Sequence, residues 1–448
     1  MRVLILGAGE VGRHLARSLS SDANVVLLDA DPQALAVAEE ELDVLVMEGN
    51  ATHRDALEAA EVREADLVIS VAGTDSVNVA ACVLAKNLGA RRCVARVDDP
   101  GFYRGALGVE RDVAGIDACV CASRLVGVDL MRLVNRVEVG WTSTFVGGAV
   151  HVGVIELGED SPVAGGPIGS LGTEAASITR AVLRGDSIRL PSEIASLEAG
   201  DRVILGGPPV GVASVARSMR ASGSKSVVIM GGGDVGLQLA RALSALTREV
   251  SIVEESRERC EALASILAKT TILHGNGTNL AFLREEQIGR AETALAVTGS
   301  DEVNLMSSLL SNELGVEHTF ALVHRPGYAS VYAHLGIDGT TSAHEVLAST
   351  LQWLLPGRTV VSSATLPDSD WSILELRVPH QLPRQLRVRD LSLGASTRIL
   401  GVLPHSDPTI APEANPVLQG GEHLLVACPI RDRRSAERGV TRMETKDG

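Results

Sequence analysis

The sequence is poor in aromatic residues, which make up 2% of its 448 residues although 45% of them are hydrophobic. Its cores must therefore be built from valine, leucine, isoleucine and alanine, a composition that suits buried parallel strands covered by helices. No run approaches the roughly 18 apolar residues of a membrane span. The chain opens directly on an apolar strand, without the basic and apolar segments of a secretion signal. We therefore expect a cytoplasmic protein with no transmembrane part.

Positive charge is scarce as well, because 41 Lys and Arg stand against 56 Asp and Glu and give a formal net charge of −15. This balance argues against a nucleic-acid partner and against electrostatic binding to a membrane surface. The six cysteines form no Cys-x-x-Cys pair, and the eleven histidines form no His-x-x-x-His pair. We therefore expect neither a disulfide scaffold nor a metal site.

The sequence does contain a glycine motif that occurs twice. MRVLILGAGEVG opens the chain and SVVIMGGGDVG returns about 224 residues later, each an apolar strand that runs into Gly-x-Gly-x-x-Gly. The glycines are Gly7, Gly9 and Gly12 in the first copy and Gly231, Gly233 and Gly236 in the second. In a strand–turn–helix the first glycine allows the turn, the second lets the backbone approach a pyrophosphate, and the third lets the helix pack on the strand. The phosphates then bind the free N–H groups at the start of the helix.

An acidic residue ends the apolar strand that follows each glycine motif. NVVLLD ends in Asp29, and EVSIVE ends in Glu254. A carboxylate about 20 residues beyond the glycines accepts hydrogen bonds from a ribose hydroxyl in dinucleotide-binding proteins. It would also repel a 2′-phosphate, so this position favours NAD(H) over NADP(H).

Three further segments repeat between the halves at an offset of 226 residues. GNAT at 49–52 matches GNGT at 275–278, LVISVAGTDSVN ending at Asn78 matches ALAVTGSDEVN ending at Asn304, and ARVDDPGF at 95–102 matches ALVHRPGY at 321–328. Because the offset has drifted by only two residues from that of the glycine motifs, the halves are expected to share a fold. The alternative is a duplicated scaffold in which one copy binds no ligand.

The order of the patterns predicts an α/β protein with the organisation A–B–A′–B′. Strands alternate with helices in each A segment, which predicts a Rossmann-like parallel sheet with ligands at the carboxyl ends of its strands. Each B segment is a small α+β domain. A helix with apolar residues spaced by three and four connects the first A and B segments, and it either packs on a partner subunit or caps the sheet. The expected segments are 1–121 (A), 122–138 (helix), 139–220 (B), 225–341 (A′) and 360–441 (B′).

The two B segments carry short alternating strands between glycine and proline turns. Four residues of the first align with four of the second at an offset of 221, namely Asp186, Pro191, Gly200 and Asp201 with Asp407, Pro412, Gly421 and Glu422. Neither segment places a nucleophile beside a base, so no catalytic residue is expected. We interpret the B segments as dimerisation or sensing modules.

The first half contains the motifs MRVLILGAGEVG, LLDAD, EGNATH, VAGTDSVN, ARVDDP and IDACVC, and the second contains GGGDVG, IVEE, HGNGT, VTGSDEVN and LGID. With these motifs the chain resembles, to about residue 441, the regulatory subunits of Trk potassium-uptake systems, which are built from two RCK units (regulators of K+ conductance). The resemblance implies a non-catalytic, nucleotide-binding protein that forms a homo-oligomeric ring. It further implies a place on the cytoplasmic face of the plasma membrane, where the ring binds an integral-membrane Trk-type subunit and controls K+ flux.

The resemblance also carries nucleotide contacts onto this sequence. In the first unit they are Gly7, Ala8, Gly9, Glu10, Val11, Asp29, Ala72, Gly73 and Arg96. In the second they are Gly231, Gly232, Gly233, Asp234, Val235, Glu254, Thr298 and Gly299. We add the third glycines and two repeated turns to the candidate site, namely Gly12, Gly236, Asn50, Ala51, Thr52, Asn276, Gly277 and Thr278. Leu322 stands where the first unit has Arg96, so the second site lacks a cation for a phosphate. NAD(H) is the expected cofactor, with ATP or ADP as the alternative.

Two other functions fit parts of the pattern. An NAD-dependent dehydrogenase would explain the glycine motifs and Asp29, but it needs a substrate domain with a proton relay, and nothing large enough follows either A segment. A two-RCK regulator of a different cation transporter would show the same motifs.

Overall fold

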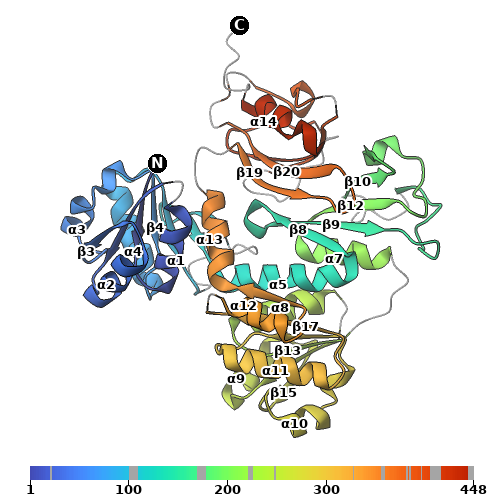
Figure 1. Cartoon of the computed structure of the whole chain (residues 1–448), viewed down its shortest axis with the longest axis horizontal. Coiled ribbons are helices and arrows are strands. Elements are labelled where there is room, and N and C mark those ends of the chain that lie inside the picture. Colours follow the sequence, from blue (N-terminus) through green and yellow to red (C-terminus); the bar gives the residue numbers. More distant parts are fainter. Residues whose placement is uncertain are drawn as a thin grey trace.

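Figure 1 shows the computed structural model of the chain, with two parallel-sheet domains and a pair of stacked antiparallel sheets around two long helices. The structure describes residues 1–20, 23–99, 109–168, 178–219, 226–246, 249–325, 327–354, 359–379, 382, 385–394, 396–403 and 415–441. In these residues, no helix has the length and apolar character needed to cross a bilayer.

The first parallel sheet has the strand order β3-β2-β1-β4-β5-β7-β6, in which only β6 runs antiparallel to its neighbour. Its strands are β1 (Arg2–Leu6), β2 (Asn24–Asp29), β3 (Leu45–Glu48), β4 (Leu67–Ser70), β5 (Cys93–Arg96), β6 (Val109–Val113) and β7 (Ile116–Val120). Its helices are α1 (Glu10–Leu19), α2 (Pro32–Glu41), α3 (Arg54–Ala59) and α4 (Asp75–Asn87). The strand order reverses between β1 and β4, and in such sheets the crevice at the reversal is where ligands bind.

The second parallel sheet repeats this arrangement in the order β15-β14-β13-β16-β17-β18. Its strands are β13 (Ser226–Met230), β14 (Glu249–Glu254), β15 (Thr270–His274), β16 (Thr293–Ala296), β17 (His318–Val323) and β18 (Gly339–Ser342). Its helices are α8 (Asp234–Ala245), α9 (Arg257–Ile266), α10 (Leu280–Glu285), α11 (Asp301–Glu313) and α12 (Tyr328–His334). The order again reverses beside the strand that precedes the glycine motif. The predicted duplication of a Rossmann-like α/β unit is therefore confirmed.

Two antiparallel sheets follow the two parallel ones. The first has the order β11-β10-β12-β9-β8 and the second the order β19-β20-β22-β21. The elements of the first are β8 (Trp141–Phe145), β9 (Val150–Glu156), β10 (Thr179–Arg184), β11 (Ser187–Arg189), β12 (Arg202–Gly207) and α7 (Pro209–Ser218). Those of the second are β19 (Val360–Thr365), β20 (Trp371–Arg377), β21 (Arg398–Leu403), β22 (His423–Pro429) and α14 (Arg433–Thr441).

The two antiparallel sheets face each other within the chain. Phe145, Val152 and Ile204 from the first share one buried cluster with Ile373 and Leu425 from the second. The two B segments therefore pack against each other within the chain, and their role as dimerisation or sensing modules stays a prediction. Of the residues used to align them, Asp407 and Pro412 lie outside the described part of the chain. The exact limits of the five expected segments stay predictions.

The connecting helices cross between the halves. Helix α5 (Ala122–Val139) follows the first parallel sheet but contributes Val126 and Leu130 to the core of the second, against Leu239 of α8. Helix α13 (Ala343–Leu354) follows the second sheet but contributes Leu347 to the core of the first, against Leu15 of α1. Figure 1 shows α5 lying along the second domain and α13 beside the first. Apart from Leu125, which packs in the core of its own sheet, the first connecting helix caps the sheet of the other half, and the expectation that it packs on a partner subunit stays a prediction.

Candidate functional site

The first glycine motif forms a tight turn between β1 and α1. Gly7 has a φ of +116°, a backbone conformation that side chains disfavour, and its N–H donates to the Leu28 carbonyl at 2.8 Å. A Cβ on Gly12 would lie 1.8 Å from the Gly7 carbonyl oxygen, so only glycine lets α1 start this close to the turn. At Gly9 a Cβ would meet no atom within 4 Å. The second glycine is therefore free of any packing role and faces open space at the start of α1.

The second glycine motif has the same geometry between β13 and α8. Gly231 has a φ of +111°, and a Cβ on Gly236 would lie 2.1 Å from its carbonyl oxygen. A Cβ on Gly233 would meet nothing within 4 Å. Both loops therefore leave the first N–H groups of a helix open at the carboxyl edge of the sheet, where an anion is stabilised.

The acidic residues that end β2 and β14 lie against the glycine turns. One oxygen of Asp29 accepts from the Ala8 N–H at 2.5 Å, and the other accepts from the Asp31 N–H at 2.9 Å. Glu254 accepts from the Gly232 N–H at 2.8 Å and from the Ser256 N–H at 2.8 Å. Each carboxylate is thus fixed beside its loop by two backbone donors, at the position expected for a ribose ligand.

An arginine holds the carbonyl of the same loop residue in each half, a feature that sequence comparison did not reveal. Arg13, from α1, donates to the Ala8 carbonyl at 2.8 Å. Arg259, from α9, donates to the Gly232 carbonyl at 2.7 Å and pairs with Asp234 at 3.3 Å. The two arginines come from different helices, so no internal alignment could have matched them.

The repeated asparagines Asn78 and Asn304 tie together the strand ends on the other side of each crevice. Buried Asn78 accepts from the Ala72 N–H at 2.7 Å and donates to the Arg96 carbonyl at 3.0 Å. Asn304 accepts from the Thr298 N–H at 2.7 Å and donates to the Leu322 carbonyl at 3.0 Å. These bonds fix the candidate residues after β4 and β16 relative to those at the ends of β5 and β17.

The remaining candidate residues fall into three groups. Gly73 and Gly299 follow these strand ends, and a Cβ on either would meet nothing within 4 Å. In the first helical turns, Glu10 is exposed, whereas Val11 and Val235 pack against the cores beneath. The turns at Asn50, Ala51 and Thr52 and at Asn276, Gly277 and Thr278 follow β3 and β15, one strand further from the reversal point. In each turn the asparagine side chain accepts from the threonine two residues on, at 2.9 and 2.7 Å, so it stabilises the turn itself.

The two candidate sites differ in charge where β5 and β17 end. Arg96 pairs with Asp98 at 2.9 Å. The corresponding residues of the second half are Leu322, which is buried, and His324, whose ring Nε2 lies 3.0 Å from the Thr298 carbonyl. The second half therefore lacks the cation at position 322, as expected, and also lacks the acidic residue that pairs with this cation in the first half.

The crossing of α13 brings a side chain of the second half close to the first candidate site. The rings of His344, on α13, and His14, on α1, have centroids 6.1 Å apart. Burial lowers the pKa of His344, nearby Glu10 opposes this shift, and the charges of His14, Arg96 and His324 add to it. The surroundings of the first site thus include residues from both halves.

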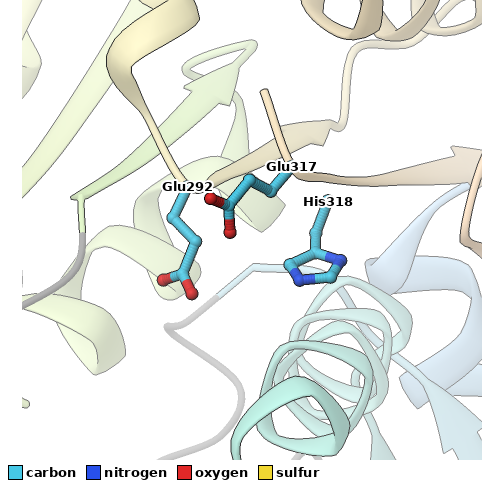
Figure 2. A group of neighbouring side chains, drawn as sticks. All are labelled: Glu292, Glu317 and His318. Atoms are coloured by element: carbon cyan, nitrogen blue, oxygen red, sulfur yellow. The ribbon is translucent and has the colours of Figure 1, made fainter. Parts of the chain in front are cut away.

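A separate cluster lies at the amino ends of β16 and β17, away from the glycine loops. Figure 2 shows Glu292, Glu317 and His318, whose ligand atoms all lie within 4.8 Å of one another. In the first half the equivalent positions hold an ion pair, between Asp66 and Arg91 at 2.6 Å. Glu317 is exposed and the other two are half-buried, and exposed acidic groups gather in this way without a metal. We assign no metal to this cluster, and the expectation that the chain binds none stays a prediction.

Comparison with known proteins gives a consistent result. Residues 3–120 and 227–343 each match the TrkA-N domain family. A Trk system potassium uptake protein TrkA homolog of Archaeoglobus fulgidus is 30% identical over 426 residues, which cover 95% of this chain and 97% of that protein. Two solved structures of the GsuK channel share the fold. The one bound to NAD has a TM-score of 0.58 at 18% identity and covers 98% of this chain and 79% of its own. The one bound to ADP has a TM-score of 0.50 at 17% identity and covers 79% and 69%.

These comparisons confirm the resemblance stated from the motifs. The relative is named for potassium uptake and not for an oxidation. The chain is not an enzyme, and the alternative of an NAD-dependent dehydrogenase is therefore rejected. The chain belongs to the TrkA-N domain family and, over nearly its whole length, to the Trk system potassium uptake proteins of the TrkA type.

Proposed function

We propose that the chain is a nucleotide-sensing regulatory subunit that binds NAD(H) in both parallel-sheet domains and gates a Trk-type potassium transporter. The observation that carries the proposal is the pair of open glycine loops, each with free space at its second glycine and a fixed carboxylate beside it. ATP or ADP is the alternative ligand, because one GsuK structure of the same fold is bound to ADP. Titration of the full chain with NADH, ATP and ADP tests the proposal.

Membership of the TrkA-type family supports a proposal for the partner and the place of action. We propose that the chain assembles as a homo-oligomeric ring on the cytoplasmic face of the plasma membrane and binds an integral-membrane Trk-type subunit there. A regulator of a different cation transporter remains the second candidate. Co-purification with a membrane subunit identifies the partner.

We expect Asp29→Ala to weaken NADH binding at the first site by about 1.5–3 kcal/mol, because a charge-assisted hydrogen bond to the ribose is lost. Asp29→Asn is the isosteric comparison, since its amide oxygen still accepts from the Ala8 N–H while the bond from the Asp31 N–H is lost. Asparagine should also reduce the preference for NAD(H) over NADP(H) by removing the repulsion of a 2′-phosphate. Calorimetric titration measures both effects, and unchanged affinity in both variants would remove Asp29 from the site.

We expect the two sites to differ in affinity or in preferred nucleotide, because only the first has Arg96. Isolated halves would be poor material for this test, since α5 and α13 each complete the core of the other half. Full-length Gly233→Val and Gly9→Val variants instead leave one site each. Arg96→Leu should bring the first site towards the second, with about tenfold weaker binding of a nucleotide whose phosphate it contacts. Equal binding by both single-site variants, unaffected by Arg96→Leu, would contradict the prediction.

A further inference from the structure

Helix α13 places a histidine of the second half beside the first glycine loop. Val346 of α13 and Val11, in the first turn of α1, pack against the same buried cluster. His344 lies two residues before Val346, and its ring centroid is 6.1 Å from that of His14 on α1. His14 follows Glu10 by four residues, so these two side chains share a face of α1. His344 therefore lies beside the first turns of α1, where the first nucleotide site is expected.

The ring of His344 has a nitrogen without a hydrogen-bond partner. Its Nδ1 is buried, and no group in the described part of the chain bonds to it. A buried polar atom that lacks a partner costs free energy, so a ligand atom that bonds to the ring is favoured. The residue as a whole is only half-buried, so the ring is not sealed from solvent. His344 is therefore available to a ligand.

The charged groups that act on His344 are mostly basic, and they come from both halves. Arg96, at the end of β5, acts on it as a positive charge, and His14 and His324 do so when they are protonated. Glu10, in the first turn of α1, acts on it as a negative charge. Basic groups that gather beside a helix start attract an anion. The surroundings of His344 therefore favour an anionic ligand.

The anion at hand is a phosphate of the nucleotide. Arg96 is the expected phosphate ligand of the first site, and its guanidinium keeps further donors beyond the one that it gives to Asp98 at 2.9 Å. We propose that His344 is a ligand of the nucleotide at the first site, where its imidazole donates a hydrogen bond to a phosphate and takes up a proton when the nucleotide binds. This inference rests on the proposed function, because it concerns the same site.

The proton uptake follows from the charge of the ligand. Burial lowers the pKa of His344, and the positive charges around it lower this pKa further, so the imidazole of the unliganded chain is neutral at pH 7. Glu345 on α13 and Arg17 on α1 act on the pKa of His14. A bound phosphate favours the imidazolium and raises the pKa of His344. A group whose pKa is higher in the complex gains a proton from solvent on binding, so the affinity rises as the pH falls.

The second site receives no such residue from the first half. Helix α5 is the counterpart of α13, and it packs on α8 as α13 packs on α1. The second residue of α13 is His344, whereas the second residue of α5 is Ser123, whose hydroxyl lies 3.2 Å from the Cys121 sulfur. Serine does not change its charge between about pH 5 and 8, the range in which histidine does. Only the first site therefore gains a proton through this position.

The test is calorimetric titration of full-length Gly233→Val, which leaves the first site, with NADH, ATP and ADP. Titration at one pH in two buffers of different ionisation enthalpy gives the number of protons taken up per nucleotide. We expect uptake of up to about one proton, and an affinity that falls as the pH rises from about 5 to 8. His344→Gln should abolish this uptake and weaken binding about tenfold at the acid end of that range, because glutamine cannot take up a proton.

His14→Gln is the matched control, since it removes the ring that faces His344 and should leave the proton uptake in place. His344→Gln in Gly9→Val, which leaves the second site, should change neither affinity nor uptake. Nucleotide binding to Gly233→Val without proton uptake would overturn this inference alone, and so would uptake that persists in His344→Gln or disappears in His14→Gln. Absence of nucleotide binding by the wild-type chain would instead remove the proposed function together with this inference.

Discussion

Gly9→Val and Gly233→Val are each expected to abolish nucleotide binding at their own site while the chain remains folded. Gly9 has φ −63° and ψ −175°, and Gly233 has φ −63° and ψ −168°, which are extended conformations that any residue adopts. A Cβ at either position meets nothing within 4 Å, so valine strains no contact in the unliganded chain. The same space is where a pyrophosphate would approach the backbone, and the isopropyl group would occupy it.

The expected loss of affinity exceeds about a hundredfold, since at least two charge-assisted hydrogen bonds from the loop to the phosphates are prevented. NADH titration of each single variant measures one remaining site, and the double variant should bind none. Gly12→Ala is the informative contrast. Its Cβ would lie 1.8 Å from the Gly7 carbonyl oxygen, so this smaller change should lower the unfolding temperature. Retained binding in the double variant would mean that the nucleotide does not enter at the glycine loops.

Much of this site could be predicted because its determinants are local. A glycine with positive φ, a glycine that a helix packs against, and a carboxylate at a strand end each follow from residues close in sequence. The repeat then places Asn78 and Asn304 at equivalent positions, and the structure gives them equivalent hydrogen bonds. No repeated sequence pattern marks the two arginines that donate to the loop carbonyls, because Arg13 and Arg259 reach the same carbonyl position from different helices.

The crossing of the connecting helices could not be predicted for a different reason. The apolar spacing of residues 122–138 predicts a helix with a buried face, but it carries no information on which sheet that face covers. Both sheets present similar valine- and leucine-rich surfaces, so the choice depends on the lengths and directions of the chain between them. A cavity that lies between the halves is a consequence of that choice, and its lining residues are therefore scattered over more than 200 positions of the sequence.

Under the proposed function, the crossing would give a physical route from a bound nucleotide to the connecting helices. Helix α1 begins at the first glycine loop, and α13 of the other half packs on it through Leu347. Helix α8 begins at the second loop, and α5 of the first half packs on it through Leu130. A nucleotide that favours one position of α1 or α8 would therefore bias the connecting helix on its surface. The size of this bias equals the difference between the binding free energies of the nucleotide for the two positions of the helix, typically about 1–3 kcal/mol.

We therefore expect the Gly9→Val, Gly233→Val double variant to abolish the nucleotide-dependent change in K+ flux while it still binds the membrane subunit. Leu347→Ala should retain nucleotide binding but reduce the response, because it removes a contact between α13 and α1. The alanine costs about 2–5 kcal/mol of stability, so Leu347→Val serves as a milder second variant, and melting curves verify that both are folded. Glu345→Gln, an exposed change on the same helix, is the control.

The measurement is ⁸⁶Rb+ uptake into vesicles that carry the membrane subunit, with each variant and with or without nucleotide. Binding and coupling separate cleanly in this design, since the glycine variants remove the ligand and the Leu347 variants leave it in place. A response in the double glycine variant equal to that of wild type would refute the sensor function. In that case the chain would act on the transporter through its assembly alone, and the two glycine loops would be remnants of the duplicated scaffold.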